Sequence, residues 1–431
     1  MGRRALLLLV TAGAGACFLP EASIDPSSSS SSSSSGSGGG GSTPGYDWAP
    51  PVSGPHKFGA SSELDKSIAS TGNPGQRHLV NVLGRWYVFY LLGHRLQASY
   101  FDAGSTWKPT GDGISLDANY TFDDGRVFGA AVDPTVPGKV HFAADWATGA
   151  FHIEAQAPPT ESAATPFVFN PATTHAEPSG ILVDGAVTTV GADGRAYDFG
   201  AFVVKGQPCT SCVTTNDGGG WMQMPLDFSA KTTGQHPRAA VSLTSSPVVA
   251  WPLVGALAAA RITDGASGWN GSEVPNTLDV KPVARSWAMC SKIVHGSSEL
   301  AAHLLVQDGP KFAHVFMNGG TWSDFPGGEL AAPPNTSSVR ELFMVCSADY
   351  LYAFTVDDTN AILGARYGAN GTEWSKWAVL VPGLSGPGAR CFLSGFDQAT
   401  PGDVGLIWTE STTDCDSKSA NTYYSLFVRI G

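Results

Sequence analysis

Arg340-Glu-Leu-Phe-Met-Val-Cys346 opens the most regular stretch of this sequence, and Tyr350-Leu-Tyr-Ala-Phe-Thr-Val356 follows it directly. Two further short runs, Ala361–Tyr367 and Trp374–Trp377, complete a unit of four. The runs are rich in β-branched and aromatic residues and are bounded by turn residues, among them Asn370-Gly371, a strong hairpin signal. The stretch therefore predicts four short antiparallel strands and shows no helical period.

Similar units recur along the chain, and six of them begin with an Arg. The first residues of the units are 47 to 58 residues apart: Arg77, Arg126, Gly180, Arg238, Arg285, Arg340 and Arg390. A β-type repeat of about fifty residues is typical of a propeller, in which four antiparallel strands form one blade. The sequence predicts an all-β fold, a seven-bladed β-propeller with four-stranded antiparallel blades. Six blades is the alternative, because the region 126–238 is the least regular.

The last unit offers three strands, within 390–396, 404–409 and 422–430. The segment around His56–Ile68 is therefore expected to supply a fourth strand. Pairing of this N-terminal strand with the last blade would close the ring, so residues 45–431 are expected to form one propeller domain.

The N-terminal residues have the features of an export signal, expected to cover 1–16. Two arginines precede the apolar run Ala5–Val10, and Ala14-Gly-Ala16 provides small residues for cleavage just before Cys17. An ordinary signal peptidase site and a lipoprotein box are both compatible with this pattern.

The tract that follows Cys17 favours the lipoprotein. Ser27–Ser35 is unbroken serine, and such a tract cannot bury surface, so 17–44 is expected to be a lipidated Cys17 followed by a disordered Ser/Gly-rich tether. The folded part would then be extracytoplasmic and lipid-anchored to a bacterial envelope, at the outer membrane or the cell surface.

Six further cysteines in an exported domain suggest disulfides. They are Cys209, Cys212, Cys290, Cys346, Cys391 and Cys415. Cys209-Thr-Ser-Cys212 lacks a second pair that would complete a zinc site, so a local disulfide is favoured over a redox or zinc role. Cys391 and Cys415 fall in one unit, and Cys290 and Cys346 take equivalent places in neighbouring units. The sequence leaves the connectivity open.

Charge and composition limit the kinds of partner that the chain is expected to bind. The formal net charge of −12 argues against nucleic acid, which requires a basic surface. No later segment approaches the ~20 apolar residues of a membrane span, so membrane contact is expected through the lipid only. The ten histidines show no paired metal-ligand spacing, and no nucleotide fingerprint or nucleophile elbow is present. We expect no cofactor, no metal and a monomer.

A second motif carries a family resemblance. Asp102-Ala-Gly-Ser-Thr-Trp107 resembles the Asp-box, or BNR repeat, of sialidase-like β-propellers, with the motif's serine displaced. A Gly turn followed by Trp recurs before Trp221, Trp269, Trp322 and Trp374. These Trp side chains are expected either to pack between blades or to stack on sugars, and Trp377, one motif further on, is the better candidate for exposure and ligand contact.

The resemblance also suggests a binding role for the recurring arginines. Sialidases hold a carboxylate with arginines near inner strands, and a ring formed by Arg77, Arg126, Arg238, Arg285, Arg340 and Arg390 could do the same. The alternative is structural, with each Arg paired to an acidic loop residue or to backbone carbonyls. The Arg-Ile-Pro motif of that family is absent.

An acidic loop before Arg126 contains the weak catalytic candidates, Tyr120, Asp123 and Asp124. In a retaining sialidase a Tyr nucleophile is polarised by a Glu, for which no candidate is evident. The sequence therefore favours non-catalytic binding of a glycan, or of an envelope or extracellular protein. The alternative is a sialidase-like glycoside hydrolase or lyase that acts on an acidic sugar, and a structural scaffold is the third class.

Overall fold

The computed structural model describes most of the repeat region and little of what precedes it. The described residues are 45–58, 77–92, 95–101, 106–115, 128–146, 149–162, 164–176, 180–204, 207–216, 221–225, 239–242, 247–253, 256–261, 270–273, 287–293, 300–308, 311–318, 321–337, 339, 341–347, 350–368, 373–397, 404–411 and 423–430. Every regular element in these ranges is a β-strand. No helix able to cross a membrane occurs in them.

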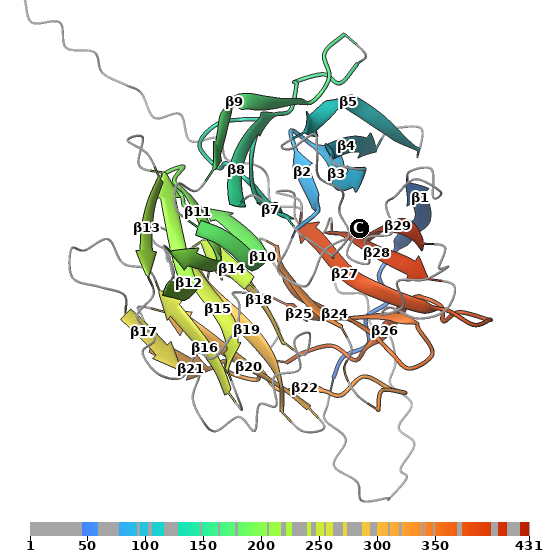
Figure 1. The fold of residues 1–431 in the computed structure, drawn as a ribbon. Helices are drawn as coiled ribbons and strands as arrows, with labels where there is room; N and C mark the ends of the chain where they lie inside the picture. The colour runs from blue at the N-terminus through green and yellow to red at the C-terminus, as the bar shows by residue number, and fades with distance from the viewer. Residues whose placement is uncertain are drawn as a thin grey trace, which may run out of the picture. The chain divides into compact units, whose positions relative to one another are not determined.

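The described strands form seven antiparallel sheets (Figure 1). The first sheet contains β2 (Leu79–Val82), β3 (Arg85–Leu92), β4 (Arg95–Phe101) and β5 (Trp107–Ser115). The second contains β6 (Phe128–Val132), β7 (Lys139–Trp146), β8 (Gly149–Gln156) and β9 (Val168–Ala176). The third contains β10 (Gly180–Val190), β11 (Ala196–Val204), β12 (Gln207–Asn216) and β13 (Trp221–Pro225).

The remaining four sheets follow the same order. The fourth contains β14 (Ala239–Ser242), β15 (Pro247–Leu253), β16 (Ala256–Arg261) and β17 (Asn270–Glu273). The fifth contains β18 (Trp287–Ile293), β19 (Leu300–Asp308), β20 (Lys311–Asn318) and β21 (Thr321–Asp324), with β22 (Leu330–Ala331) also paired to β20. The sixth contains β23 (Leu342–Cys346), β24 (Tyr350–Val356), β25 (Ile362–Gly368) and β26 (Ala378–Val381). The seventh contains β27 (Ala389–Asp397), β28 (Val404–Ser411), β29 (Tyr423–Ile430) and β1 (Val52–Phe58).

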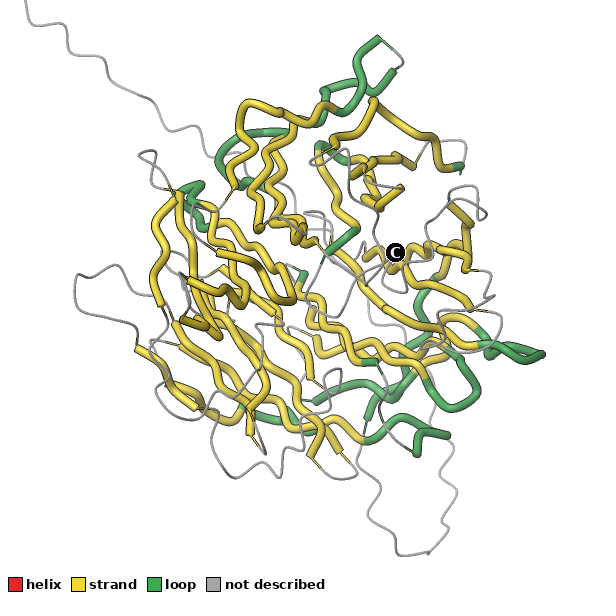
Figure 2. The backbone as a smooth tube through the Cα atoms, viewed as in Figure 1, coloured by secondary structure: helices red, strands yellow, loops and turns green. Residues whose placement is uncertain are grey.

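The first strands of these sheets contact one another in a closed cycle. Strand β2 lies against β6, β6 against β10, β10 against β14, β14 against β18, β18 against β23, β23 against β27, and β27 against β2. Strands make up most of the described backbone, and loops join them at their ends (Figure 2). Four-stranded antiparallel units packed in sequence order are the arrangement expected for propeller blades.

Strand β1 completes the last sheet from the other end of the chain. It pairs antiparallel with β29, with Val52 opposite Ile430 and Lys57 opposite Leu426. The strand expected around His56–Ile68 thus lies several residues earlier. A register shift between Ser53 and His56 surrounds Gly54-Pro55, and a Gly-Pro step disguises a strand in a sequence because proline cannot donate to the ladder.

One strand of the sixth unit also differs from the sequence prediction. The fourth strand is β26, Ala378–Val381, and not Trp374–Trp377. Trp374 forms only an isolated bridge with Tyr367, and its side chain is buried in the core between the fifth and sixth sheets. Burial of the indole therefore takes precedence over strand pairing at this point.

Hydrophobic cores fill the space between neighbouring sheets. Between the first and second sheets, Phe89 meets Phe142 edge to face at a centroid separation of 4.7 Å, and Phe167 packs beside them. Burial of one such side chain contributes on the order of 2 kcal/mol. This core fixes the spacing of the first two sheets, at whose outer strands a cavity lies.

A disulfide joins the fifth and sixth sheets. It links Cys290 of β18 to Cys346 of β23, with Cα atoms 5.6 Å apart. These are the equivalent positions in neighbouring units that the sequence suggested as one pairing. Cys391 is also disulfide-bonded, and Cys415, the partner considered for it, lies outside the described residues.

Candidate functional site

Most of the arginine series lies outside the described residues, namely Arg126, Arg238, Arg285 and Arg340. Of the two that are described, Arg390 is buried, and its Nε donates to Glu410 Oε1 across 2.7 Å. Its NH1 group donates to the carbonyls of Asn360 and Pro382, each at 2.7 Å. Arg390 thus has the structural contacts of the second interpretation, an acidic partner and backbone carbonyls.

Arg77 is half-buried and lies over an aromatic ring. Its guanidinium carbon is 5.2 Å from the centroid of the Phe396 ring, and Phe396 lies on β27, the strand that also contains Arg390. The two described arginines therefore contact the protein itself. The weak catalytic candidates Tyr120, Asp123 and Asp124 lie outside the described residues, as do the lipidation site Cys17 and the box residues 102–105.

Trp377, the candidate for exposure and ligand contact, is half-buried. Its Nε1 donates to the carbonyl of Ala331 at 2.8 Å, and its ring packs against Phe312 at the edge of the core. Trp322 and Trp374 are buried in the cores of neighbouring sheets. These contacts match the interpretation of the tryptophans as packing between blades.

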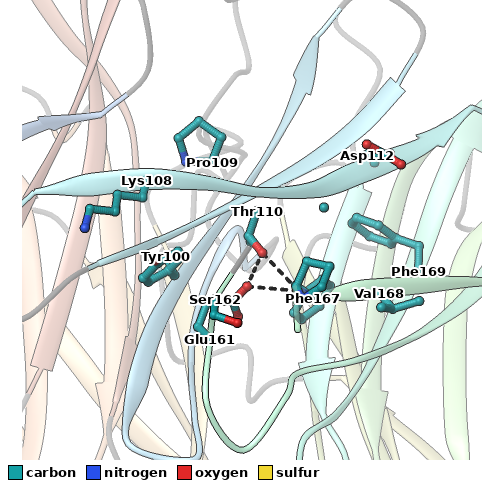
Figure 3. Close-up of a pocket in the computed structure, with 13 residues that line it drawn as sticks. Tyr100, Lys108, Pro109, Thr110, Asp112, Glu161, Ser162, Phe167, Val168 and Phe169 are labelled. Atoms are coloured by element: carbon teal, nitrogen blue, oxygen red, sulfur yellow. Dashed lines mark hydrogen bonds between the residues drawn. The ribbon is translucent and has the colours of Figure 1, made fainter. Parts of the chain in front are cut away.

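The described part of the chain contains a cavity of about 670 Å³ beside β5, the outermost strand of the first sheet (Figure 3). Its opposite wall is the segment of the second sheet that leads into β9. The lining residues are Tyr100, Lys108, Pro109, Thr110, Gly111, Asp112, Gly113, Glu161, Ser162, Pro166, Phe167, Val168 and Phe169. A volume of this size accommodates a small ligand.

Glu161 is the carboxylate at the wall of this cavity. Its Oε2 accepts a hydrogen bond of 2.7 Å from the hydroxyl of Tyr87, and its Oε1 accepts one of 3.0 Å from the backbone N–H of Phe167. The hydroxyl of Thr110 also donates to Oε1 (Figure 3). These three donors fix the carboxylate, which can accept roughly four hydrogen bonds and so has capacity for a ligand hydroxyl.

Tyr87 provides a rigid support for Glu161 from within the first sheet. The tyrosine is fully buried on β3, and Arg85 NH1 donates to its hydroxyl at 3.3 Å. Burial, together with the neighbouring Glu161, raises the pKa of Tyr87 above its ordinary value, so the phenol remains a donor at neutral pH.

Glycine at position 111 allows the two walls to approach each other. Gly111 has a φ of +66°, and a Cβ there would lie 2.4 Å from the carbonyl oxygen of Phe167. No L side chain fits such a contact, and the left-handed backbone also favours glycine. The pairing of β4 with β5 shifts register at the same place, between Leu96 and Ala98. The local chain path of Thr110-Gly-Asp-Gly113 thus shapes the cavity.

The polar groups of the cavity have both signs. Lys108 and Asp112 are exposed on β5, and Tyr100, half-buried on β4, contributes an aromatic ring. The arrangement offers acceptors at Glu161 and Asp112, a donor at Lys108 and apolar surface, which together suit a ligand with hydroxyl groups and a hydrocarbon face.

Sequence reasoning did not identify Glu161, Thr110 or Phe167 as site residues. Glu161 lies in a Pro-rich connection, and its proximity to Tyr87 and Thr110 depends on contact between two sheets. The one available signal is the Gly-Asp-Gly sequence after Thr110, which marks an irregular strand.

Comparisons with known proteins identify the fold of this chain. No protein-family model and no curated protein sequence matches this chain. Among solved structures, the BP39L lectin from Burkholderia pseudomallei aligns with a TM-score of 0.54 and 14% identity, over 78% of this chain and 96% of the lectin. A polysaccharide lyase, an ulvan lyase, gives a TM-score of 0.48 and 12% identity over 84% and 94% of the two chains. AofleA from Arthrobotrys oligospora gives 0.45 and 11% over 77% and 96%. The likeness to the lectin shows that the chain has a β-propeller fold.

Proposed function

We propose that this protein is a seven-bladed β-propeller that binds a glycan in the cavity beside Glu161. The single observation that carries the proposal is that cavity, whose carboxylate is fixed by Tyr87, Thr110 and the Phe167 backbone. The closed cycle of seven sheet contacts supports the blade number.

The cavity suits a sugar better than it suits the surface of a protein partner. Protein partners generally meet broad surfaces, whereas small ligands occupy concave sites that combine apolar walls with a few fixed polar groups. Sugar hydroxyls can donate to Glu161 and accept from Lys108, and the C–H face of a pyranose can pack on Tyr100. BP39L, a solved structure to which this chain is similar in fold, is a lectin, so a glycan is the first class of ligand to test.

The charges favour a neutral sugar. Glu161 and Asp112 are both acidic, and Lys108 offers a single positive charge. A sulfate or a uronic carboxylate placed beside Glu161, where the ligand is proposed to bind, would be repelled by its carboxylate. We therefore expect neutral hexoses to bind more tightly than the acidic sugars considered from the sequence.

The proposal includes export and lipidation at Cys17. The Cys290–Cys346 disulfide supports an extracytoplasmic location, because such bonds persist in oxidising compartments. Incorporation of radiolabelled palmitate, absent in a Cys17→Ala variant, is the expected result. Equal labelling of the variant would contradict lipidation at this residue.

The test of binding is a glycan array probed with the purified protein and its Glu161→Gln variant. We expect a signal on neutral glycans that falls at least about 10-fold in the variant, since a hydrogen bond to a charged acceptor contributes 1.5–3 kcal/mol. Glu329→Gln is the matched control, because Glu329 is an exposed carboxylate paired with Lys311 and remote in sequence from the cavity.

Two results would contradict the proposal. One is an array without signal for a protein whose far-UV circular dichroism shows it to be folded. The other is glycan binding that Glu161→Gln and Lys108→Met both leave unchanged. Release of sugar products during incubation would instead support the enzymatic alternative.

A further inference from the structure

Two buried histidines face each other within the second sheet. His141 lies on β7 and His152 on β8, both 2% exposed, and His141 Nδ1 is 3.1 Å from His152 Nε2. Their ring centroids are 5.2 Å apart. The ten residues between these histidines match no known metal-ligand spacing, so the sequence alone does not indicate a role for them.

The outer nitrogen of each ring meets a carboxylate. His141 Nε2 is 3.2 Å from Asp133 Oδ2, in the turn before β7. His152 Nδ1 is 2.8 Å from Asp198 Oδ2, on β11 of the next sheet.

The inner nitrogens of the two rings face each other. Each outer nitrogen lies beside a carboxylate, and a ring that donates its N–H to that carboxylate presents a lone pair at its inner nitrogen. His141 Nδ1 and His152 Nε2 are 3.1 Å apart, so one cation could bind both nitrogens.

The position of Glu154 indicates which cation fits between the two ring nitrogens. Glu154 Oε1 lies 3.8 Å from His141 Nδ1, and this oxygen and the two inner nitrogens all lie within 4.8 Å of one another. A shared proton would join the two nitrogens without a third group. Two imidazoles and one carboxylate are instead a donor set that Zn²⁺ accepts at about 2.0–2.2 Å, with a fourth position left for water.

We propose that His141 Nδ1, His152 Nε2 and Glu154 Oε1 bind one Zn²⁺ ion, with Asp133 and Asp198 as the outer partners that orient the two rings. Ligating histidines usually donate their other N–H to a carboxylate in this way. Because Asp198 belongs to the third sheet, the ion would strengthen the contact between the second and third sheets. The site is independent of the glycan cavity.

The ammonium of Lys139 lies where it would affect the affinity for Zn²⁺. Its Nζ lies 2.7 Å from Glu154 Oε1 and 3.9 Å from Asp133 Oδ2, so its ammonium competes with the ion for the same carboxylate. Removal of this positive charge is expected to tighten Zn²⁺ binding, whereas removal of a ligand weakens it.

The chain offers its own control. His303 on β19 and His314 on β20 repeat the geometry, with Nδ1 to Nε2 at 3.0 Å and centroids 5.2 Å apart. Phe325, Tyr367 and Trp374 surround His314. Within the part of the chain that the structure describes, only the first pair belongs to a group of three ligand atoms.

The test uses the full chain after dialysis against a chelator, titrated with Co²⁺ as a visible probe and then with Zn²⁺ in competition. We expect one Co²⁺ per chain, with absorption typical of nitrogen and oxygen ligands. Glu154→Gln should weaken binding about 10-fold, and His152→Asn and Asp198→Asn on the order of 10- to 100-fold. Lys139→Met should bind more tightly, and His314→Asn should match the unaltered protein.

Three outcomes would overturn the site: no metal bound per folded chain, affinity unchanged in both Glu154→Gln and His152→Asn, or a sulfur-to-cobalt charge-transfer band that assigns the ion to Cys209 and Cys212. Glu154 and Lys139 are partly exposed, so their variants should fold, as circular dichroism can verify, even if those of the buried histidines do not.

Discussion

The hydroxyl of Tyr87, on β3 of the first sheet, donates a hydrogen bond of 2.7 Å to Oε2 of Glu161, in the connection between β8 and β9 of the second sheet. A buried side chain of the neighbouring sheet thus holds the proposed ligand-binding carboxylate. Site geometry and packing of the two sheets depend on the same contact.

Tyr87→Phe is expected to lower both the stability of the protein and its affinity for a glycan. The substitution keeps the ring in the core and removes one donor from a charged acceptor, so the free energy of unfolding should fall by about 1.5–3 kcal/mol. Urea unfolding measures this loss. Glycan affinity should fall in parallel, because Glu161 is less well oriented. A stability loss with unchanged affinity would show that the ligand does not contact Glu161.

Alanine substitutions of three glycines separate backbone strain from steric clash. Gly84 (φ +75°) has nothing within 4 Å of an added Cβ, and Gly111 (φ +66°) would meet the Phe167 carbonyl at 2.4 Å. Gly84→Ala should cost about 1–2 kcal/mol of unfolding free energy, and Gly111→Ala more than that, with loss of glycan binding. Gly386→Ala, with open space and no left-handed strain, should be near neutral. Equal costs at positions 84 and 111 would contradict close approach of the cavity walls.

Arg390→Met is expected to destabilise the protein without affecting ligand binding. The substitution removes the Arg390 donor from the carbonyls of Asn360 and Pro382 and from Glu410, which keeps the hydrogen bond from Trp408 Nε1. Removal of one member of a buried pair costs about 3–5 kcal/mol. Arg195→Met is the control, since Arg195 and Asp193 form an exposed ion pair worth less than about 1 kcal/mol. Weaker glycan binding by folded Arg390→Met would restore the arginine to a binding role.

His314 should make the protein sensitive to mild acid. Burial, and then the neighbouring His303, lower the pKa of His314 well below its ordinary value, so the folded protein binds no proton there when the unfolded chain does. Stability contributed by the neutral ring is complete above the unfolded pKa near 6.5 and falls as the pH drops below it. The free energy of unfolding, measured by urea denaturation at pH 7.5 and 5.5, should fall less in His314→Gln than in the unaltered protein. The difference between the two proteins should grow by up to about 1.4 kcal/mol per pH unit below pH 6.5. Identical pH slopes would contradict this assignment.

The repeat could be read from the sequence because each strand has its own local pattern. The run Tyr350–Val356 was predicted with the bounds of β24, because its aromatic and β-branched residues lie between turn residues. The fourth strand of the sixth unit was misplaced because Trp374 was attributed to a strand, whereas its burial between sheets is a tertiary effect. Local patterns cannot reveal what a neighbouring sheet covers.

The candidate site could not be predicted for the same reason. Glu161 and Tyr87 are far apart in sequence, and neither belongs to a motif. The arginine series was conspicuous, yet Arg390 serves its own sheet through Glu410. The two histidine pairs share the spacing His141–His152 and His303–His314, a repeat that becomes meaningful only when the diagonal contact between adjacent strands is known.

The pairing of β1 with β29 has a consequence for the order of folding. Val52 lies opposite Ile430, so the partner of this early strand is made long after it. The other six sheets can form as soon as their own consecutive strands emerge, whereas β1 must wait until β29 has been made. Such a distant contact is costly in loop entropy and is therefore slow to form. Newly made chains should pass through a period with six sheets complete and the seventh lacking its edge, during which β29 is open to pairing with another chain.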